Sequence, residues 1–494
     1  MQNYYKYNNQ IVTKNTMLTV EKKYISQNNI KSYDLMKKAG SAFAKIIIGN
    51  FPKSKVLFIC GKGGNGGDGL ISAYILKKKG WPVSFILTDI PKNLSKDTSK
   101  ALDKLKLSPQ NFSDLKIKSF DLIVDAIFGI GISRKITGIE KSIISKINSS
   151  KVPIIAIDIP SGVNSDTGEI MGVATNCSFT ATFSRAKIGN ILLPGYKNNG
   201  HLKIVNIGIP NSYFSKYKPE IITNIDKIWK NKIIFPKIDA HKYSRGYTLI
   251  IGGPKSMTGA SRLAALAAQR AGSGIVVVAV SKNSENIYFS SLTSQIIKSY
   301  RNLKEFRSIL DDPRINSIVV GPGLGQGKKT ISKMKIIFEK KRRAVIDADA
   351  ISSFQNNIDL LKKITRGSDI VYTPHEGELL KLFPNLKGNA IEKSIYAANN
   401  LNSTFVLKGP NTLVSNKKTD KIIVNIPGAR WLATAGSGDV LAGIIGALMA
   451  TGVESFTSAG LGVYIHSESG KVGGPGMVAE DLINIMPSIL KKLL

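Results

Sequence analysis

Two glycine-rich loops in the chain have residue types that could bind anions and carry out chemistry. The first, CGKGGNGGDGL at residues 60–70, follows an apolar run and opens a helical pattern. Glycines let backbone N–H groups approach a phosphate, and a helix N-terminus favours negative charge. A plain tight turn explains glycines equally well, but it requires neither the amide of Asn65 nor the carboxylate of Asp68. We therefore interpret this loop as a site for a cation, a ribose or a phosphate.

Two further loops follow strand patterns in the same half of the chain, DAIFGIGISRK at 125–135 and DIPSGVNSDTG at 158–168. Each aspartate alone is more typical of a helix cap or a turn. The carboxyl ends of parallel strands, however, converge on one crevice of an open α/β sheet. The pattern therefore predicts a single site that gathers Asn65, Asp68, Asp125, Asp158 and Ser161.

The second glycine-rich loop is TAGSGDVLAGIIGALMA at residues 434–450. A Gly-x-Gly-Asp turn at a helix start offers backbone N–H groups to an oxyanion or phosphate, with Asp439 beside them. The loop lacks the GK[ST] of a Walker motif. The plainer alternative is an ordinary aspartate near a helix N-terminus.

Strand patterns alternate with helical patterns on both sides of a weakly patterned segment at 210–246. This alternation predicts two α/β domains with parallel sheets covered on both faces. We place the boundary near residue 218, which gives domains 1–217 and 218–494, and we interpret residues 1–16 as a polar extension. The apolar run 440–453 is too short to span a membrane and is predicted to be a buried helix.

The net charge of +35 over 494 residues comes from lysines scattered along the whole chain. No basic block is interleaved with aromatic residues, so we predict neither nucleic-acid nor membrane binding. The two cysteines, Cys60 and Cys177, form no CxxC motif, which excludes a disulfide framework and a structural zinc site. Because no signal-peptide pattern is seen either, we expect a cytoplasmic protein.

The first half resembles the NAD(P)H-hydrate epimerases over about residues 17–215. The loop at 60–70 is similar to their GxGNNGGDG signature, and LMKKAG (35–40), DAIFGIG and DIPSG…DTG resemble its companions in the same order. The resemblance implies a Rossmann-like three-layer αβα domain. Gly64 stands where the family has the first asparagine of its pair, so one side-chain contact to the ligand is lost.

The epimerase resemblance also implies roles for individual residues. It makes Asn65, Asp125 and Ser161 potassium ligands, and oxygen-only ligation suits this hard cation. Asp158 becomes the candidate acid/base for inversion at C6 of the hydrated nicotinamide, although the ring can also open and reclose with little help. The implied contacts to the nucleotide are Gly64, Asn65, Gly66, Gly67, Asp68, Gly129, Ile130, Gly131, Ile132, Ser133, Arg134, Lys135 and Asp158.

The second half resembles the ADP/ATP-dependent NAD(P)H-hydrate dehydratases over residues 226–494, which implies a ribokinase-like α/β domain. The motifs, in chain order, are HKYSRGYTLIIGG, MTGASRLAALAAQRAGSG, VVGPGLG, VIDADA, YTPHEGEL, VLKGPNTLV and the loop at 434–450. Lys471 departs from the family, which commonly has an aspartate there.

In the dehydratase resemblance Asp439 is the catalytic base, and Mg²⁺ with ADP or ATP is the implied cofactor. Lys408 has a plainer alternative as a solvated strand-end lysine, and Asp347 and Asp349 are either near the metal or merely strand-end carboxylates. The implied hydrate contacts are Ala260, Gly323, His375 and Asp439. The implied nucleotide contacts are Lys408, Gly409, Pro410, Asn411, Thr412, Gly436, Ser437 and Gly438.

Together the two resemblances predict a bifunctional enzyme. It would interconvert the R and S hydrates of NADH and NADPH (NADHX and NADPHX) and dehydrate the S form at the expense of ADP or ATP. The expected partners are these small molecules and, as a homo-oligomer, further copies of the chain. The alternatives are a vitamin-precursor kinase that accumulates a phosphorylated product, an RNA- or membrane-binding protein that uses the +35 charge, and an enzyme with one degenerate half.

Overall fold

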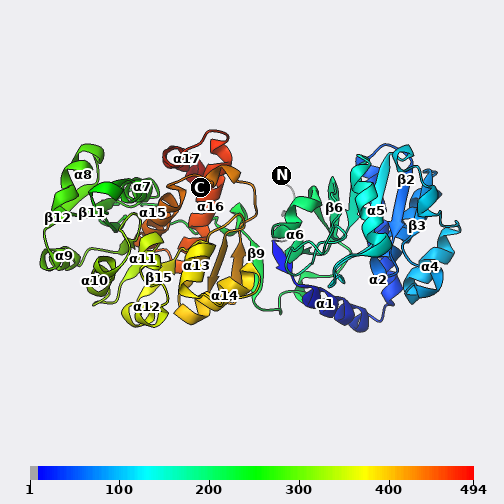
Figure 1. Ribbon diagram of the computed structural model, residues 1–494, viewed down its shortest axis with the longest axis horizontal. Coiled ribbons are helices and arrows are strands. Elements are labelled where there is room, and N and C mark those ends of the chain that lie inside the picture. Colours follow the sequence, from blue (N-terminus) through cyan, green and yellow to red (C-terminus); the bar gives the residue numbers. More distant parts are fainter. Residues whose placement is uncertain (1–8) are drawn as a thin grey trace. The chain divides into compact units, whose positions relative to one another are not determined.

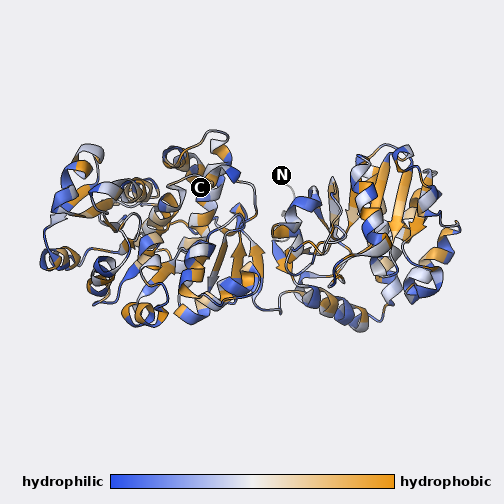
Figure 2. Cartoon of the chain, in the orientation of Figure 1, coloured by the Kyte–Doolittle hydropathy of each residue, from blue (hydrophilic) through white to orange (hydrophobic). Residues whose placement is uncertain are grey.

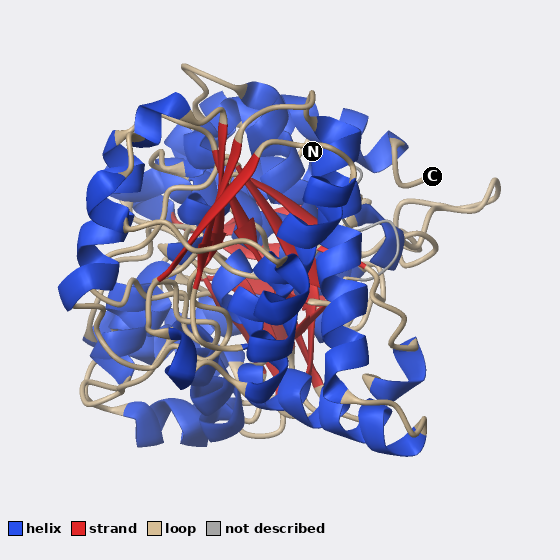
Figure 3. Ribbon diagram, turned by 90° about the vertical axis from the view of Figure 1, so that its right-hand side faces the viewer, coloured by secondary structure: helices blue, strands red, loops and turns tan. Residues whose placement is uncertain are grey.

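The computed structural model describes residues 9–494 and divides into two compact units, Met1–Ile221 and Ile222–Leu494 (Figure 1). Each unit is a parallel sheet between helices, which confirms the predicted α/β class (Figure 3). None of the helices in the described part of the chain is long and apolar enough to cross a membrane.

The N-terminal unit is built on a parallel sheet of order β3-β2-β4-β5-β6-β8. Its strands are β2 (Val56–Cys60), β3 (Val83–Leu87), β4 (Leu122–Ala126), β5 (Ile154–Ile157), β6 (Phe179–Phe183) and β8 (His201–Val205). Its helices are α1 (Lys14–Gln27), α2 (Ser32–Asn50), α3 (Gly64–Lys78), α4 (Lys96–Leu105), α5 (Gly138–Ser149) and α6 (Ile188–Ile191).

Strand β2 shows why this sheet is covered on both faces. Val56 and Phe58 pack into the core that α1 to α4 cover, whereas Leu57 and Ile59 pack against the isoleucines of α5. Side chains alternate between the faces of a strand, so a strand that is apolar throughout requires a helix on each side. Figure 2 shows the strands as the most hydrophobic parts of the unit.

Part of the segment expected to be a polar extension is ordered and buried, which corrects that expectation. Residues 1–8 lie outside the described residues, but β1 (Gln10–Val12) is buried and pairs in parallel with β7 (Ala186–Lys187). Helix α1 then begins at Lys14, where the side chain of Thr13 accepts a hydrogen bond from Thr16 N–H. The short strand was missed because three residues are too few to show a period.

The C-terminal unit contains a sheet of order β12-β11-β10-β13-β14-β15-β16-β17-β18, in which only the pairs β16–β17 and β17–β18 are antiparallel. The strands are β10 (Tyr247–Ile251), β11 (Ile275–Ser281), β12 (Ile296–Tyr300), β13 (Ser317–Val320), β14 (Arg343–Ile346), β15 (Asp369–Tyr372), β16 (Thr404–Leu407), β17 (Leu413–Asn416) and β18 (Lys421–Val424). Strand β9 (Glu220–Thr223) precedes them, and Asn224 N–H donates to Val424 O.

Helices α7 (Thr258–Arg270), α15 (Ser437–Ala450), α16 (Ser455–Gly473) and α17 (Ala479–Lys491) cover one face of this sheet. Figure 1 shows the other face covered by α10 (Lys328–Ile337), α11 (Ala348–Ser352), α12 (Ile358–Thr365), α13 (Glu376–Leu382) and α14 (Ala390–Leu401). At the β12 end lie α8 (Glu285–Ser291) and α9 (Leu303–Leu310).

Helix α15 is the central helix of this unit. Every residue from Val440 to Ala450 is buried, as expected for the apolar run there. Gly443 allows its close approach to α7, since a Cβ at Gly443 would lie 2.2 Å from Ala264 O. This packing positions the start of α15, which carries Asp439.

Candidate active sites

In the N-terminal unit, a cavity of about 590 Å³ lies at the carboxyl ends of β2, β4 and β5. The loops after these strands bring Asn65, Asp68 and Asp158 to one space. The predicted contact residues that line it are Gly64, Asn65, Asp68, Gly129, Ile130, Gly131, Ile132, Ser133, Arg134, Lys135 and Asp158.

Gly66 and Gly67, which were expected to contact the ligand as well, are not among the lining residues. A Cβ at Gly66 would lie 1.8 Å from Gly61 O, and one at Gly67 would lie 2.4 Å from Met36 Cε. Both glycines are therefore explained by the close packing of the first turn of α3 against β2 and α2.

Asp158 has a backbone conformation that is unusual for a residue with a side chain, with φ +66°. Its Oδ1 accepts hydrogen bonds from Thr182 Oγ1 at 3.0 Å and Phe183 N at 3.0 Å, and it forms an ion pair with Lys187 Nζ. Among the described residues nothing donates to Oδ2. Because Oδ1 is fully engaged, Oδ2 is the atom of Asp158 that can act on a ligand.

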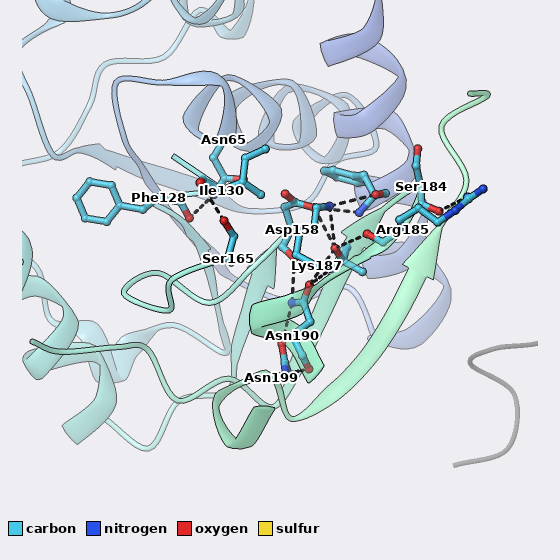
Figure 4. A network of polar contacts seen from close by, with 12 residues as sticks. Asn65, Phe128, Ile130, Asp158, Ser165, Ser184, Arg185, Lys187, Asn190 and Asn199 are labelled. Carbon is cyan, nitrogen blue, oxygen red and sulfur yellow. Dashed lines mark hydrogen bonds and ion pairs between the residues drawn. The ribbon is translucent and has the colours of Figure 1, made fainter. Parts of the chain in front are cut away.

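Lys187 is a buried cation that the sequence analysis missed. Its side chain is 1% exposed, and Nζ also donates to Thr182 Oγ1 at 3.0 Å and Phe183 O at 3.1 Å. Figure 4 shows this network continuing through Asn190, which donates to Asp158 O at 3.4 Å and to Asn199 Oδ1 at 3.0 Å. A lysine in the mostly apolar run AKIGNILL at 186–193 was the available signal.

Two further carboxyls line the same cavity, those of Glu21 in α1 and Asp68 in α3. The pKa of Glu21 is raised to about 7. Burial is the main cause, Lys187 acts to lower the pKa, and Asp158 acts to raise it. Burial likewise raises the pKa of Asp68 well above its usual range. Sequence analysis missed Glu21 because it lies among lysines that are typical of a solvated helix face.

Asn65, Asp125 and Ser161 meet around the backbone of Phe128. Asn65 Nδ2 donates to Phe128 O at 3.0 Å, Phe128 N donates to Ser161 Oγ at 2.8 Å, and Ser161 Oγ donates to Asp125 Oδ1 at 2.5 Å. Asp125 is fully buried, and no cationic side chain of residues 9–494 pairs with it. Asp125 Oδ2 also accepts hydrogen bonds from Ser161 N at 2.8 Å and Thr175 Oγ1 at 2.5 Å, so the carboxyl is hydrogen-bonded but has no cationic side chain of the described residues beside it. Oxygen atoms gathered in this way fit a bound cation.

In the C-terminal unit, the start of α15 forms a second candidate site. Gly436 has φ +86°, and the N–H groups of Gly438 and Asp439 donate to no described residue. The pKa of Asp439 is raised to about 7. Burial is the main cause, Asp347 also raises the pKa, and Lys408 lowers it. Free N–H groups beside a buried carboxyl could bind an anion and accept a proton, which is the chemistry that the loop pattern predicts.

Lys408 is not the solvated strand-end lysine of the plainer interpretation. Its Nζ lies 2.6 Å from Asp347 Oδ1 and 3.9 Å from Glu378 Oε2. A Cβ at Gly438 would lie 3.3 Å from that ammonium, so Lys408 reaches the start of α15. Glu378 belongs to the TPHEGEL motif, but sequence analysis assigned it no role.

Four other residues with predicted or possible roles lie in neighbouring loops and helix starts of the same unit. His375 caps α13, with Nδ1 accepting from Glu378 N, and its side chain is 57% exposed. Gly323 has φ +59°, and a Cβ there would lie 3.1 Å from Ala260 Cβ, which makes these two neighbours. Asp349 accepts a hydrogen bond from Gly325 N at 2.9 Å.

The loop Lys408–Thr412 closes on itself after β16. Thr412 Oγ1 donates to Gly409 O at 3.0 Å, and Lys408 N donates to Pro374 O at 2.8 Å. Asn411 Nδ2 donates to Asn425 O at 3.4 Å, and Pro410 lies between these residues in the turn. The loop therefore begins beside Pro374 and His375.

His466 of α16 was also missed. Its Nε2 lies 2.8 Å from the carbonyl oxygen of Ser437, and burial lowers its pKa to about 4. A neutral imidazole that donates to this carbonyl holds the first turn of α15 in place.

The comparisons with known proteins cover both units. A family model described as YjeF-related protein N-terminus matches residues 32–189, and one described as NAD(P)H-hydrate dehydratase matches residues 248–487. A ribokinase-like superfamily protein from Enterococcus faecalis, 22% identical, superposes with a TM-score of 0.50 over 55% of this chain and 96% of its own. The expected ribokinase-like fold of the second half is thereby confirmed.

Two curated relatives span nearly the whole chain, and both are named bifunctional NAD(P)H-hydrate repair enzyme Nnr. The protein from Dictyoglomus turgidum is 32% identical over 98% of this chain and 99% of its own. The protein from Moorella thermoacetica is 30% identical over 98% of this chain and 97% of its own. The chain therefore belongs to the family of bifunctional NAD(P)H-hydrate repair enzymes.

Proposed function

We propose that the N-terminal unit interconverts the R and S hydrates of NADH and NADPH at C6, and that the C-terminal unit dehydrates the S hydrate with ADP or ATP. The observation that carries this proposal is found in both units: a carboxylate stands beside a glycine turn at a helix start. These carboxylates are Asp158, near the start of α3, and Asp439, in the first turn of α15.

For the epimerase, the loops at 64–68 and 129–135 hold the nucleotide, and Asp158 acts on the C6 hydroxyl through Oδ2. This role is supported by the hydrogen bonds and ion pair of Asp158 Oδ1, which leave Oδ2 available to the ligand. Asn65, Asp125 and Ser161 are the potassium ligands in this proposal, supported by the burial of Asp125 and its hydrogen bond from Ser161 Oγ. A bound potassium ion would supply charge stabilisation to the loop and no proton transfer.

For the dehydratase, Asp439 removes the proton of the C6 hydroxyl, and the hydroxyl oxygen attacks the terminal phosphorus of the nucleotide. The nucleotide leaves with one phosphate fewer. The C6–O bond of the phosphorylated hydrate then breaks, a proton is lost from C5, and the C5=C6 double bond of the dihydropyridine is restored. Phosphate therefore appears in equal amount to the regenerated cofactor.

The nucleotide phosphates are held at the turn 436–438, where the N–H groups of Gly438 and Asp439 are free, and by Lys408. The turn 409–412 lies against the rest of the nucleotide. The hydrate contacts Ala260, Gly323 and His375 in this proposal. Residues 9–494 contain no group of three or more acidic, histidine or cysteine side chains placed to hold a metal ion. A bound Mg²⁺ would therefore be held mainly by the nucleotide phosphates and water, with Asp349 as a nearby carboxylate. When bound, the ion would neutralise phosphate charge.

The domain boundaries follow the compact units, 1–221 for the epimerase and 222–494 for the dehydratase. A homo-oligomer in the cytoplasm, where ADP, ATP and reduced nicotinamide nucleotides are used, completes the proposal. Light scattering on the purified chain measures the oligomeric state.

The decisive experiment supplies purified R and S hydrates of NADH with ATP or ADP and follows absorbance of the regenerated cofactor. We expect the S hydrate to be consumed in one phase and the R hydrate to follow at a rate set by epimerisation. Recovery from neither epimer would overturn the dehydratase, and recovery from the S hydrate with no enzymatic recovery from the R hydrate would overturn the epimerase. A stable phosphorylated product without cofactor recovery would instead favour the vitamin-precursor kinase.

A further inference from the structure

We propose that Glu21 is the second acid–base residue of the N-terminal cavity, and that it works with Asp158 on opposite faces of the hydrate's C6. This inference rests on the proposed epimerase function and assigns a residue to it. Glu21 lies ahead of residues 32–189, which the N-terminal family model matches.

Helix α1 presents one stripe of side chains to the cavity. Leu18, Glu21 and Ile25 all line it, at the spacing of three and four residues that places side chains on one helix face. The neighbouring stripe, Met17, Val20 and Tyr24, is buried in the core and fixes the rotation of the helix. Glu21 is therefore held at the cavity by the packing of its own helix.

The carboxyl of Glu21 is free for a ligand. It is half-buried, and within the described part of the chain it forms no hydrogen bond or ion pair. A carboxyl in an apolar stripe loses hydration and gains nothing from the fold, so it opposes stability. Such a group is typical of an active site and not of a structural contact.

Four ionisable groups from four elements interact with one another in this cavity. They are Glu21 of α1, Asp68 of α3, Asp158 after β5 and Lys187 of β7. The other ionisable residues of the lining are Lys62, Asp89, Asp97, Arg134, Lys135 and Glu140. Among the four interacting groups, the one ammonium, that of Lys187, forms its ion pair with Asp158. Glu21 lacks such a contact, and burial keeps its pKa at about 7. Glu21 is therefore the carboxyl of this group that can exchange a proton near neutral pH, beside an Asp158 that is held by Lys187, and such a pair of carboxyls in different environments is typical of an acid and a base.

This pair accounts for inversion at C6 with balanced atoms. The Glu21 carboxyl protonates the C6 hydroxyl, the C6–O bond breaks, and the N1 lone pair forms the N1=C6 bond as water leaves. A second water on the other face loses a proton to Asp158 while its oxygen bonds to C6 and the π pair returns to N1. One water leaves and one enters, and a proton passes from Glu21 to Asp158. The reverse reaction uses the two carboxyls in exchanged roles.

The test measures enzymatic interconversion of separated R and S hydrates by chromatography, above the spontaneous rate, between pH 5.5 and 9. In the wild type we expect the rate to fall as pH rises through about 7, because Glu21 loses its proton. Glu21→Gln should lower kcat by about 10²- to 10⁴-fold with little change in KM and should abolish this alkaline limb. Glu21→Asp should retain part of kcat and the limb.

Three controls separate the possible outcomes. Glu169→Gln makes the same change at an exposed residue away from the cavity and should leave the rate and the limb intact. A thermal unfolding profile and full dehydration of pure S hydrate should show that Glu21→Gln is folded. If Glu21→Gln keeps the wild-type kcat, or if Asp68→Asn and not Glu21→Gln removes the limb, this assignment is wrong. A wild type that does not interconvert the epimers would overturn the proposed epimerase itself.

Discussion

The ammonium of Lys408 lies 2.6 Å from the carboxylate of Asp347, which is 1% exposed. This ion pair joins the ends of β14 and β16 and holds the lysine next to the first turn of α15. A buried pair is costly to break because the remaining charge has no partner. Lys408 therefore combines a structural role with the proposed phosphate contact.

Lys408→Met should impair both the stability of the C-terminal unit and the binding of the nucleotide. We expect a loss of about 3–5 kcal/mol in the free energy of unfolding of the C-terminal unit, because Asp347 stays buried and unpaired. We also expect a raised KM for ADP and ATP. Denaturant unfolding and dehydratase kinetics measure the two effects.

The double variant Lys408→Met/Asp347→Leu serves as the control, since replacing both charges by apolar groups is close to neutral for stability. It should regain stability without regaining activity. Recovery of dehydratase activity in the double variant would argue against a phosphate contact by Lys408.

Asp439→Asn should stop dehydration while R/S interconversion continues, because the proposed epimerase residues all lie in the other unit. Both reactions are measured on the same preparation by absorbance and chromatography. The exposed Glu480→Gln is a suitable matched control in the same unit. Loss of both activities in folded Asp439→Asn would contradict the separation of the sites.

The pH dependence of dehydration should follow the Asp439 carboxyl. Its pKa is raised by burial to about 7, and a base must be ionised, so the rate should rise with pH through about 7. A rate that is constant from pH 5.5 to 8 would contradict the assignment of Asp439 as the base.

The raised pKa of Asp439 also makes the free energy of unfolding depend on pH, and stability should fall with pH where the dehydration rate rises. The folded state binds the proton more tightly than the unfolded chain, whose value is near 3.8, so stability falls as pH rises from about 4 to 7. Asp439→Asn removes this loss. Its gain in free energy of unfolding over the wild type should be larger at pH 8 than at pH 4, as measured by denaturant unfolding.

The glycines of the loop at 60–70 should respond very differently to a methyl group. A Cβ at Gly64 would meet nothing within 4 Å, whereas one at Gly66 would lie 1.8 Å from Gly61 O. Gly64→Ala should therefore leave the melting temperature unchanged, and Gly66→Ala should lower it and epimerase activity together. Equal melting temperatures would contradict the packing of α3 against β2.

Gly64→Asn provides a separate test of the lost ligand contact. The open space lines the cavity, so the amide fits and should lower KM for the hydrate without changing dehydratase activity. An unchanged or raised KM would show that the missing asparagine does not limit binding here.

Potassium dependence should require Asp125. We expect the wild-type epimerase to be activated by K⁺ at constant ionic strength, with choline as the balancing cation. Asp125→Asn removes the buried negative charge and should abolish this activation. Activation of equal size in the variant would rule out Asp125 as a ligand.

Much of the fold could be predicted from local patterns. The apolar runs at 55–60, 120–128 and 152–160 contain β2, β4 and β5. The segment at 369–378 contains β15, and the motif at 345–350 begins within β14. Of the five residues expected in one site, Asn65, Asp68 and Asp158 line one cavity because strand ends in a parallel sheet converge. The other two, Asp125 and Ser161, are buried and do not line it. The edge strands β12 and β8 are half-exposed, so they lack the continuous apolar run and were missed.

The sequence by itself determined the two α/β units, the glycine turns at the starts of α3 and α15, and the carboxylates beside them. These features depend on residues that are close together in the sequence, so local patterns are enough to predict them. Only the tertiary structure decided the charge state of the sites. Glu21 and Lys187 are ordinary surface residue types by sequence, and Lys408 fits a solvated strand end. Burial and ion pairing arise when distant elements meet, and these set which carboxyl keeps its proton and which lysine is held at a helix start.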